Sequence, residues 1–188
     1  MLTQKGFLLI ILTIFFLSIS PVHAQTDSTG PVDYETLFKE NLTRGGKVLN
    51  LSGKKIGDAG LKVLLNQDFI KNLKKLDLRY NQISPQGAKT LAQSPPLAKL
   101  KTLILKHNFF SDEGSLALAY SHSFPNLENL QLGWNEMRDA GALALAETKN
   151  FPKLKKLDLR GNFLAEKTKN ILTTTLTHLK TLRLFQSE

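Results

Sequence analysis

The chain has 188 residues, contains no cysteine and carries a formal net charge of +9 at pH 7. The length allows one domain, and the lack of cysteine excludes disulfides, so the fold has to be stabilised by burial alone. The excess of basic side chains favours anionic surfaces in general, but it does not indicate a fold.

Residues 1–24 are typical of a secretory signal peptide. Lys5 precedes an apolar run over residues 7–17, and a Val-His-Ala sequence ending at Ala24 suits cleavage before Gln25. The apolar run is shorter than the roughly 20 residues that a membrane-spanning helix needs. We therefore expect an exported product in the periplasm, in the medium or at the cell surface, with no stable membrane insertion. The short signal on a compact, lysine-rich protein favours a bacterial source.

Residues 25–45 are predicted to form a leader and an N-terminal capping helix. Asp33 suits the N-cap position, and Glu35 places negative charge in the first turn, where the helix dipole favours it. Four apolar residues share one face of this helix: Tyr34, Leu37, Phe38 and Leu42. We expect this face to cover the start of the domain that follows.

Residues 46–188 contain an internal repeat with a period of 27 residues. Four segments share the pattern L-x-x-L-x-L-x-x-N: residues 73–81, 100–108, 127–135 and 154–162. A degenerate first unit precedes them and a partial unit follows, which gives about five repeats plus a partial sixth. Such a period predicts that each unit buries its leucines only against its neighbours, so that no unit folds alone.

The second half of each unit has the features of a helix. Aspartate stands where three of these helices are expected to begin, and Ser84 followed by Pro85 provides an N-cap with proline at the first helical position. Those aspartates are Asp58, Asp112 and Asp139. Glycine recurs nearby at Gly60, Gly87, Gly114 and Gly141, where close backbone approach is the simplest explanation.

On these motifs the chain resembles the leucine-rich-repeat proteins, and the resemblance covers nearly everything from Gly46 to the C-terminus. The long unit with a full helix is similar to the ribonuclease-inhibitor-like subclass, which also includes activators of the Ran GTPase. The resemblance implies an α/β solenoid of horseshoe shape, with a parallel β-sheet on the concave face and helices on the convex face. Strands about 4.8 Å apart and helices about 10 Å thick would force this curvature.

Asparagine closes each strand motif, at Asn81, Asn108, Asn135 and Asn162. The amide offers two donors and an acceptor to turn backbone that would otherwise be buried without partners. These residues are predicted to form a structural asparagine ladder, and loss of one is expected to cost about 1 to 3 kcal/mol.

Function has to be inferred from the side chains on the concave face, because a fold alone does not imply function. Tyr80, His107 and Trp134 share one column beside the asparagines, which predicts three rings along one rim of the sheet. Tryptophan, tyrosine and arginine are the residues that dominate binding hot spots. The candidate protein-binding residues are Arg79, Tyr80, Lys106, His107, Gln131, Trp134, Asp158 and Arg160.

Two other interpretations of these residues stay open. The rings can simply pack over the adjacent turns, and the basic residues among the candidates can be ordinary solvated charges. Lysine also recurs at the first position after the leading leucine or glycine of most units, where it is expected to discourage association through the sheet edge. These lysines are Lys47, Lys74, Lys101, Lys155 and Lys180.

Catalysis is not expected from this sequence. Asp77 and Asp158 occupy equivalent strand positions, but they lie three repeats apart, roughly 14 Å at about 4.8 Å per strand. A glycosidase pair needs about 5 to 9.5 Å. The histidines fall at different repeat positions with no pattern for a triad or a metal site. We therefore expect no enzyme activity, no metal and no cofactor.

The prediction is an exported, monomeric protein-binding module that holds a protein partner on its concave face and has no specific affinity for nucleic acid. One alternative is a GTPase-activator-like repeat protein, which export and the short array disfavour. The other is a binder of an anionic polymer through the basic surface of the chain.

Overall fold

The computed structural model describes residues 32–185, so the predicted signal peptide and the leader lie outside the described residues. The helices are α1 (Tyr34–Asn41), α2 (Gly57–Leu65), α3 (Pro85–Ala92), α4 (Ser111–Ala119), α5 (Asp139–Glu147) and α6 (Glu166–Thr175), and a 3-10 helix spans Asp68–Asn72. The strands are β1 (Leu42–Thr43), β2 (Val48–Asn50), β3 (Lys75–Asp77), β4 (Thr102–Ile104), β5 (Asn129–Gln131), β6 (Lys156–Asp158) and β7 (Thr181–Arg183).

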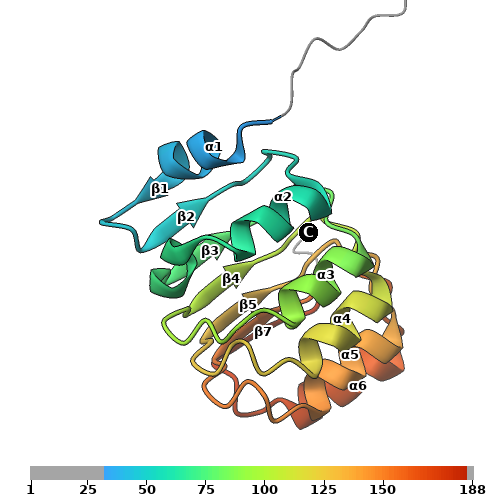
Figure 1. The fold of residues 1–188 in the computed structure, drawn as a ribbon. Helices are drawn as coiled ribbons and strands as arrows, with labels where there is room; N and C mark the ends of the chain where they lie inside the picture. Colours follow the sequence, from blue (N-terminus) through green and yellow to red (C-terminus); the bar gives the residue numbers. More distant parts are fainter. Residues whose placement is uncertain (1–31, 186–188) are drawn as a thin grey trace, which may run out of the picture. The chain divides into compact units, whose positions relative to one another are not determined.

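The strands form one sheet in the order β1 to β7, and β2 to β7 run parallel. The register joins equivalent positions of successive units, as where Leu76 of β3 lies opposite Leu103 of β4. Helices α2 to α6 follow one another along one side of this sheet (Figure 1). This arrangement confirms the predicted α/β repeat solenoid. We call the sheet face away from these helices the open face.

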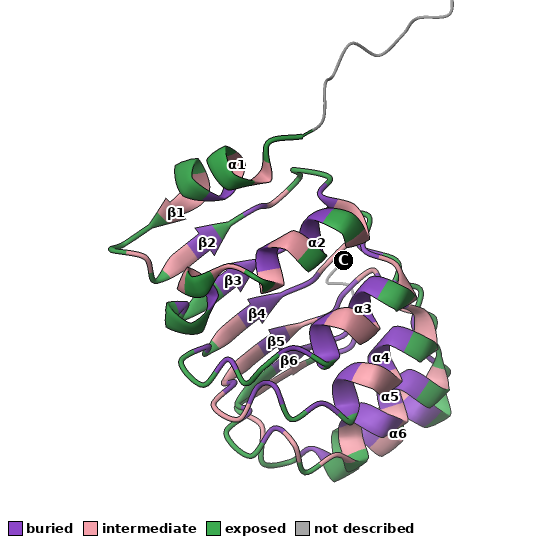
Figure 2. Cartoon of the chain, in the orientation of Figure 1, coloured by how far each residue is buried: buried purple, intermediate pink, exposed green. Residues whose placement is uncertain are grey.

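The repeated leucines form the core between the sheet and the helices. Leu73, Leu76 and Leu78 of one unit are fully buried, as are Leu100, Leu103 and Leu105 of the next. Figure 2 shows buried residues in the strands and in the helices that pack beside them. Each fully buried leucine contributes about 1.5 to 3 kcal/mol, so the stacked columns are the main source of stability.

The N-terminal segment differs in part from its prediction. Asp33 caps α1 by accepting a hydrogen bond from the Thr36 N–H at 3.1 Å, and Phe38 is fully buried, as expected of a capping helix. However, α1 ends at Asn41, and Leu42 begins β1 rather than extending the helical face. The boundary placed at residue 46 therefore falls inside a hairpin.

The hairpin exists because the chain reverses sharply over residues 44–46, where all three residues have positive φ angles between 55° and 75°. This reversal lays β1 antiparallel to β2, with Leu42 opposite Leu49. The sequence contains no alternating pattern for a strand of two residues, so periodicity could not reveal it. The added strand protects an edge of the sheet that would otherwise be open.

The aspartates at the starts of the helices do not cap their own helices. Asp58 accepts a hydrogen bond from the backbone N–H of Ser84 at 2.9 Å, and Asp112 accepts one from Gly141 at 2.7 Å. Each carboxylate thus binds the helix start of the following unit. A Cβ atom at Gly141 would lie 2.8 Å from Asp112 Oδ1, so glycine there leaves room for the carboxylate. The predicted close approach is confirmed, and its neighbour is a side chain of the preceding repeat.

Candidate protein-binding surface

The four asparagines lie at the rim where the strands end, which we call the strand-end rim, and they form a hydrogen-bonded ladder. Asn108 Oδ1 accepts from the backbone N–H groups of Asn81 and Ile83 at 3.1 and 3.0 Å. Its Nδ2 donates to the carbonyls of Leu78 and Leu105 at 3.0 and 2.9 Å. One buried amide therefore satisfies backbone groups of two successive repeats.

Asn135 departs from this pattern. Its Nδ2 donates to the carbonyls of Leu105, Leu132 and Gly133 at 3.0 to 3.1 Å. Its Oδ1 is buried and has no hydrogen-bond partner among residues 32–185. This rung of the ladder consequently satisfies carbonyls but no backbone N–H group.

Tyr80, His107 and Trp134 stack face to face along the same rim, and we call them the aromatic column. The ring centroids of Tyr80 and His107 are 4.2 Å apart with planes inclined by 12°, and those of His107 and Trp134 are 4.7 Å apart with planes inclined by 10°. All three residues have left-handed backbone, with φ angles of 54° to 55°. The turn after each strand orients these side chains in parallel.

Glycine occupies the same position at both ends of the column, as Gly53 before it and Gly161 after it, again with positive φ. A Cβ atom at Gly161 would collide with the indole of Trp134, so the tryptophan ring lies against the Gly161 backbone. A Cβ atom at Gly53 would meet nothing within 4 Å. The stack is therefore closed at Trp134 and open at Tyr80, whose exposed fraction is 50%.

Ion pairs surround the column on the open face. Asp77 accepts two hydrogen bonds from Arg79, at 3.0 Å from Nε and 2.9 Å from an Nη atom. Asp158 binds Arg160 in the same way, at 3.0 and 2.7 Å. Each of these carboxylates is therefore paired with the arginine of its own unit.

Asp158 has a second cation, because Lys106 Nζ lies 2.7 Å from its Oδ2. Lys106 follows β4 and Asp158 ends β6, so the lysine crosses β5 to make this contact. Gly133 stands between them and offers no side chain that would obstruct it. Lys106 Nζ and the Arg160 guanidinium also lie 5.6 and 5.8 Å from the ring centroid of Trp134, within range of a cation–π contact.

These contacts determine the charge states of the site. Burial raises the pKa of Asp158, but hydrogen bonds from Arg160 and Lys106 outweigh it and lower the pKa below its usual range. The pKa of Arg160 is raised by the same carboxylate. Burial, together with the positive charges of Lys106 and Arg79, lowers the pKa of His107. At neutral pH the column therefore consists of uncharged rings beside ionised pairs.

Two further phenylalanines extend the aromatic surface and were missed from the sequence. Phe109 and Phe163 directly follow Asn108 and Asn162, and their exposed fractions are 49% and 61%. With His107, Trp134 and Glu136 they line a hollow of about 340 Å³. The signal was present in the column after the asparagines, which reads Gln82, Phe109, Glu136 and Phe163. We call the aromatic column together with these two phenylalanines the aromatic rim.

Gln131 is the candidate that lies apart from this network. It lines a smaller polar hollow on the open face, between β5, β6 and β7, with Asp158 as its only neighbour among the other candidates. The structure thus brings the rings and the charged candidates together at the strand-end rim and places Gln131 beside them.

The recurring lysines lie along the opposite rim, where the strands start, which we call the strand-start rim. Glu128 takes the equivalent position in its unit and pairs with Lys101 at 2.8 Å and with Lys155 at 2.7 Å. Hydrogen bonds from these two lysines lower the pKa of Glu128 to about 2. Glu128 therefore interrupts the row of recurring lysines and forms an ion pair with the lysine of the unit before it and with the lysine of the unit after it.

Comparison with known proteins supports the repeat. One family model described as "Leucine Rich repeat" matches residues 70–92 and 125–146, and a second, described as "Leucine Rich Repeat", matches residues 99–117. The chain contains leucine-rich repeats. No curated protein matches the sequence.

Among solved structures, the leucine-rich-repeat chain is similar to one described as "Leiomodin-1 Actin-Binding Site 2 (ABS2)". The two sequences are 14% identical, the match covers 85% of this chain and 82% of that one, and the TM-score is 0.47.

Within residues 32–185, no helix is both long and apolar enough to cross a membrane.

Proposed function

We propose that the protein is an exported binding module that holds a protein partner at the aromatic rim and on the adjoining open face. One observation carries the proposal. Three stacked rings occupy turn positions whose backbone favours glycine, and Tyr80 at the open end of the stack is exposed, as are Phe109 and Phe163 beside it.

The conformational cost of these positions is the first step. A non-glycine residue in the left-handed region costs roughly 1 to 2 kcal/mol, and Tyr80, His107 and Trp134 all adopt it. Each stacked pair returns only about 0.5 to 1.5 kcal/mol beyond its buried area, and the column contains two pairs. Internal stacking therefore returns about 1 to 3 kcal/mol against a strain of about 3 to 6 kcal/mol. Backbone strain of this kind clusters at functional sites, where surrounding structure holds it in place.

The exposure of the rim is the second step. Tyr80, Phe109 and Phe163 are each about half exposed or more, and they gather around one hollow and one stack instead of being scattered. Clustered exposed aromatic surface is typical of protein interaction sites, and aromatic and arginine side chains dominate binding hot spots.

The rigidity of the aromatic column is the third step. Stacking holds its three rings in one arrangement before any partner arrives, and the two cations paired with Asp158 lie beside the Trp134 ring. Binding then loses little side-chain entropy, which favours affinity.

Capture from extracts with the purified protein tests the site. A Tyr80→Ala/Trp134→Ala variant should lose the specific proteins that the unsubstituted chain retains. Tyr120→Ala is the matched control, because Tyr120 is 71% exposed but lies at the end of α4, away from the rim. Equal retention by the rim variant and the control would refute the site, and no specific retention by the unsubstituted chain would refute the module.

The proposal includes export and the ribonuclease-inhibitor-like subclass. Export is supported by the signal-like residues 1–24, and the subclass by the 27-residue period with a helix of 8 to 10 residues in each unit. N-terminal sequencing of the protein from its own cells should give Gln25 as the first residue and recover it outside the cytoplasm. Recovery of the uncleaved chain in the cytoplasm would exclude export.

A further inference from the structure

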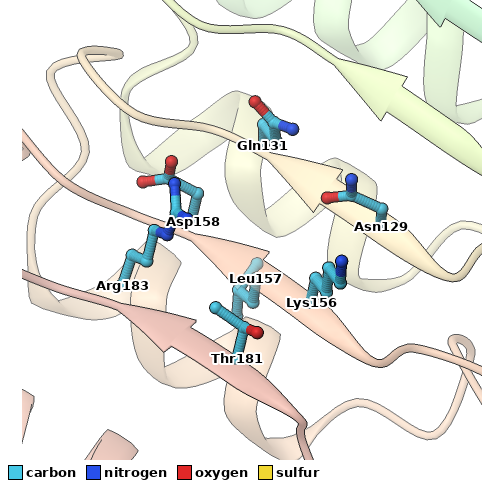
Figure 3. A pocket seen from close by; sticks show the side chains of 7 residues that line it. All are labelled: Asn129, Gln131, Lys156, Leu157, Asp158, Thr181 and Arg183. Atoms are coloured by element: carbon cyan, nitrogen blue, oxygen red, sulfur yellow. The ribbon is translucent and has the colours of Figure 1, made fainter.

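We infer that the open face carries a second site, which accepts a carboxylate group of the protein partner in the polar hollow between β5, β6 and β7. The hollow has a volume of about 190 Å³. Figure 3 shows the side chains that three neighbouring strands contribute to it. Its polar lining consists of Asn129, Gln131, Lys156, Asp158, Thr181 and Arg183.

Four of the six polar side chains of this hollow have no side-chain partner within residues 32–185, in contrast to the network at the strand-end rim. Among residues 32–185, the side chains of Asn129, Gln131, Lys156 and Arg183 take part in no hydrogen bond or ion pair. Two cations and two amides thus line one small hollow with donors that no described residue uses. A ligand that only accepts hydrogen bonds would suit this set of donors.

The local charge is the second argument. Asp158 is the one acid of the lining, but Lys106 and Arg160 already contact it at 2.7 Å. Its charge is therefore matched, and within residues 32–185 it forms no ion pair with Lys156 or with Arg183, which lies opposite it on β7. The remaining positive charge favours an anion, and the planar fork of an arginine binds a carboxylate through two parallel hydrogen bonds.

The source of the anion follows from the proposed ligand of the module, which is a protein. The anionic groups of an unmodified protein are carboxylates. The hollow therefore suits a single carboxylate, as provided by an aspartate, a glutamate or a chain terminus. This inference rests on the proposed function for the source of the carboxylate, a protein partner.

A titration with an N-acetylated peptide of four glutamates tests the inference directly. The probe is added to the purified protein at pH 7 and low salt, and the side-chain amide signals of Asn129 and Gln131 are followed by NMR. We expect saturable shifts of both amides. A Lys156→Ala/Arg183→Ala variant should bind the peptide about tenfold more weakly, because it loses two charged contacts on an exposed face.

The control removes the same charge elsewhere. Lys75 occupies on β3 the column that Lys156 occupies on β6, and Lys54 is exposed in the first unit, so Lys75→Ala/Lys54→Ala should change the affinity by less than about twofold. Equal weakening in both variants would show general attraction to a basic protein and overturn the site. A lack of saturation would also overturn it.

A parallel titration with inorganic phosphate separates the sources of anion. Tighter binding of phosphate than of the peptide would overturn the assignment to a carboxylate. The peptide titration does not depend on Tyr80 or Trp134, so its failure would leave the capture result at the aromatic rim standing. Conversely, failed capture with successful titration would refute the proposed function alone.

Discussion

The two rims of the sheet repeat with the same period, but they are built from different interactions. At the strand-end rim, successive units contact each other through buried amides and stacked rings. At the strand-start rim, successive units are linked by exposed lysines around Glu128. Two columns that recur equally in the sequence therefore contribute unequally to stability, because the contacts at one rim are buried and those at the other are exposed.

The physical reason is the competition with water. A buried amide that loses its partners leaves backbone groups unsatisfied, at about 1 to 3 kcal/mol each. Ion pairs between exposed side chains are typically worth about 0 to 1 kcal/mol and weaken with salt. Substitutions at the strand-end rim should therefore cost more stability than substitutions at the strand-start rim.

Asn108→Ala should lower the free energy of unfolding by about 3 kcal/mol, because it removes partners from N–H groups and carbonyls of two repeats. Urea denaturation measures the change. Asn135→Ala is the internal control and should cost less. The Oδ1 of Asn135 has no partner among the described residues, so removal of this side chain leaves only backbone carbonyls without a partner. Equal costs would contradict the role given to the Oδ1 contacts.

Gly161→Ala should destabilise the chain by about 1 to 2 kcal/mol through its positive φ and should also displace the Trp134 ring. A change in Trp134 fluorescence reports the displacement. Gly53→Ala introduces a comparable strain at φ 72°, but it meets no atom within 4 Å and should leave the emission unchanged. The same emission change in both variants would show that the Trp134 ring does not rest on Gly161.

His107 should titrate below its usual pKa of 6.5, because burial and the nearby cations Lys106 and Arg79 disfavour its protonated form. The unfolded chain then takes up this proton more readily than the folded chain. Stability from this residue is therefore fully present above about pH 6.5 and decreases as the pH falls toward the lower, folded pKa. NMR titration of the imidazole checks the midpoint, and a value at or above 6.5 would contradict the stacked, uncharged ring.

Glu128→Gln should have the smallest effect, a barely detectable shift of the urea midpoint that disappears at high salt. The folded pKa of about 2 lies below the usual 4.5, so the contribution of Glu128 is present above about pH 4.5 and is lost as the pH falls toward 2. Denaturation at pH 7 and at pH 2.5 with low salt measures it. A large loss of stability in this variant at pH 7 would show that the strand-start rim contributes as much to stability as the strand-end rim.

The sequence predicts those features that recur in every unit. The leucine columns, the helix in each repeat and the sequential order of the strands follow from the 27-residue period, which shortens to 25 residues between β6 and β7. The period also brings Tyr80, His107 and Trp134 into one column, so their proximity could be foreseen. Their stacking could not, because it depends on the left-handed turn that orients each ring.

Features that break the period, or that join one unit to the next, were harder to foresee. Strand β1 arises from a single reversal of the chain, and Phe109 and Phe163 alternate with polar residues in their column. Asp58 looks like a cap for its own helix when only local sequence is considered. The N–H group that it binds belongs to Ser84, 26 residues later, and only the stacking of the units brings the two together.

The contact between Lys106 and Asp158 changes how this solenoid should come apart. Repeat proteins ordinarily couple each unit only to its immediate neighbours, so they can fray one unit at a time from an end. Here a largely buried ion pair reaches over β5 and joins units that are not adjacent. Fraying past β6 has to break this tie as well as the ordinary contacts between neighbours, so β4, β5 and β6 should open together as one cooperative block.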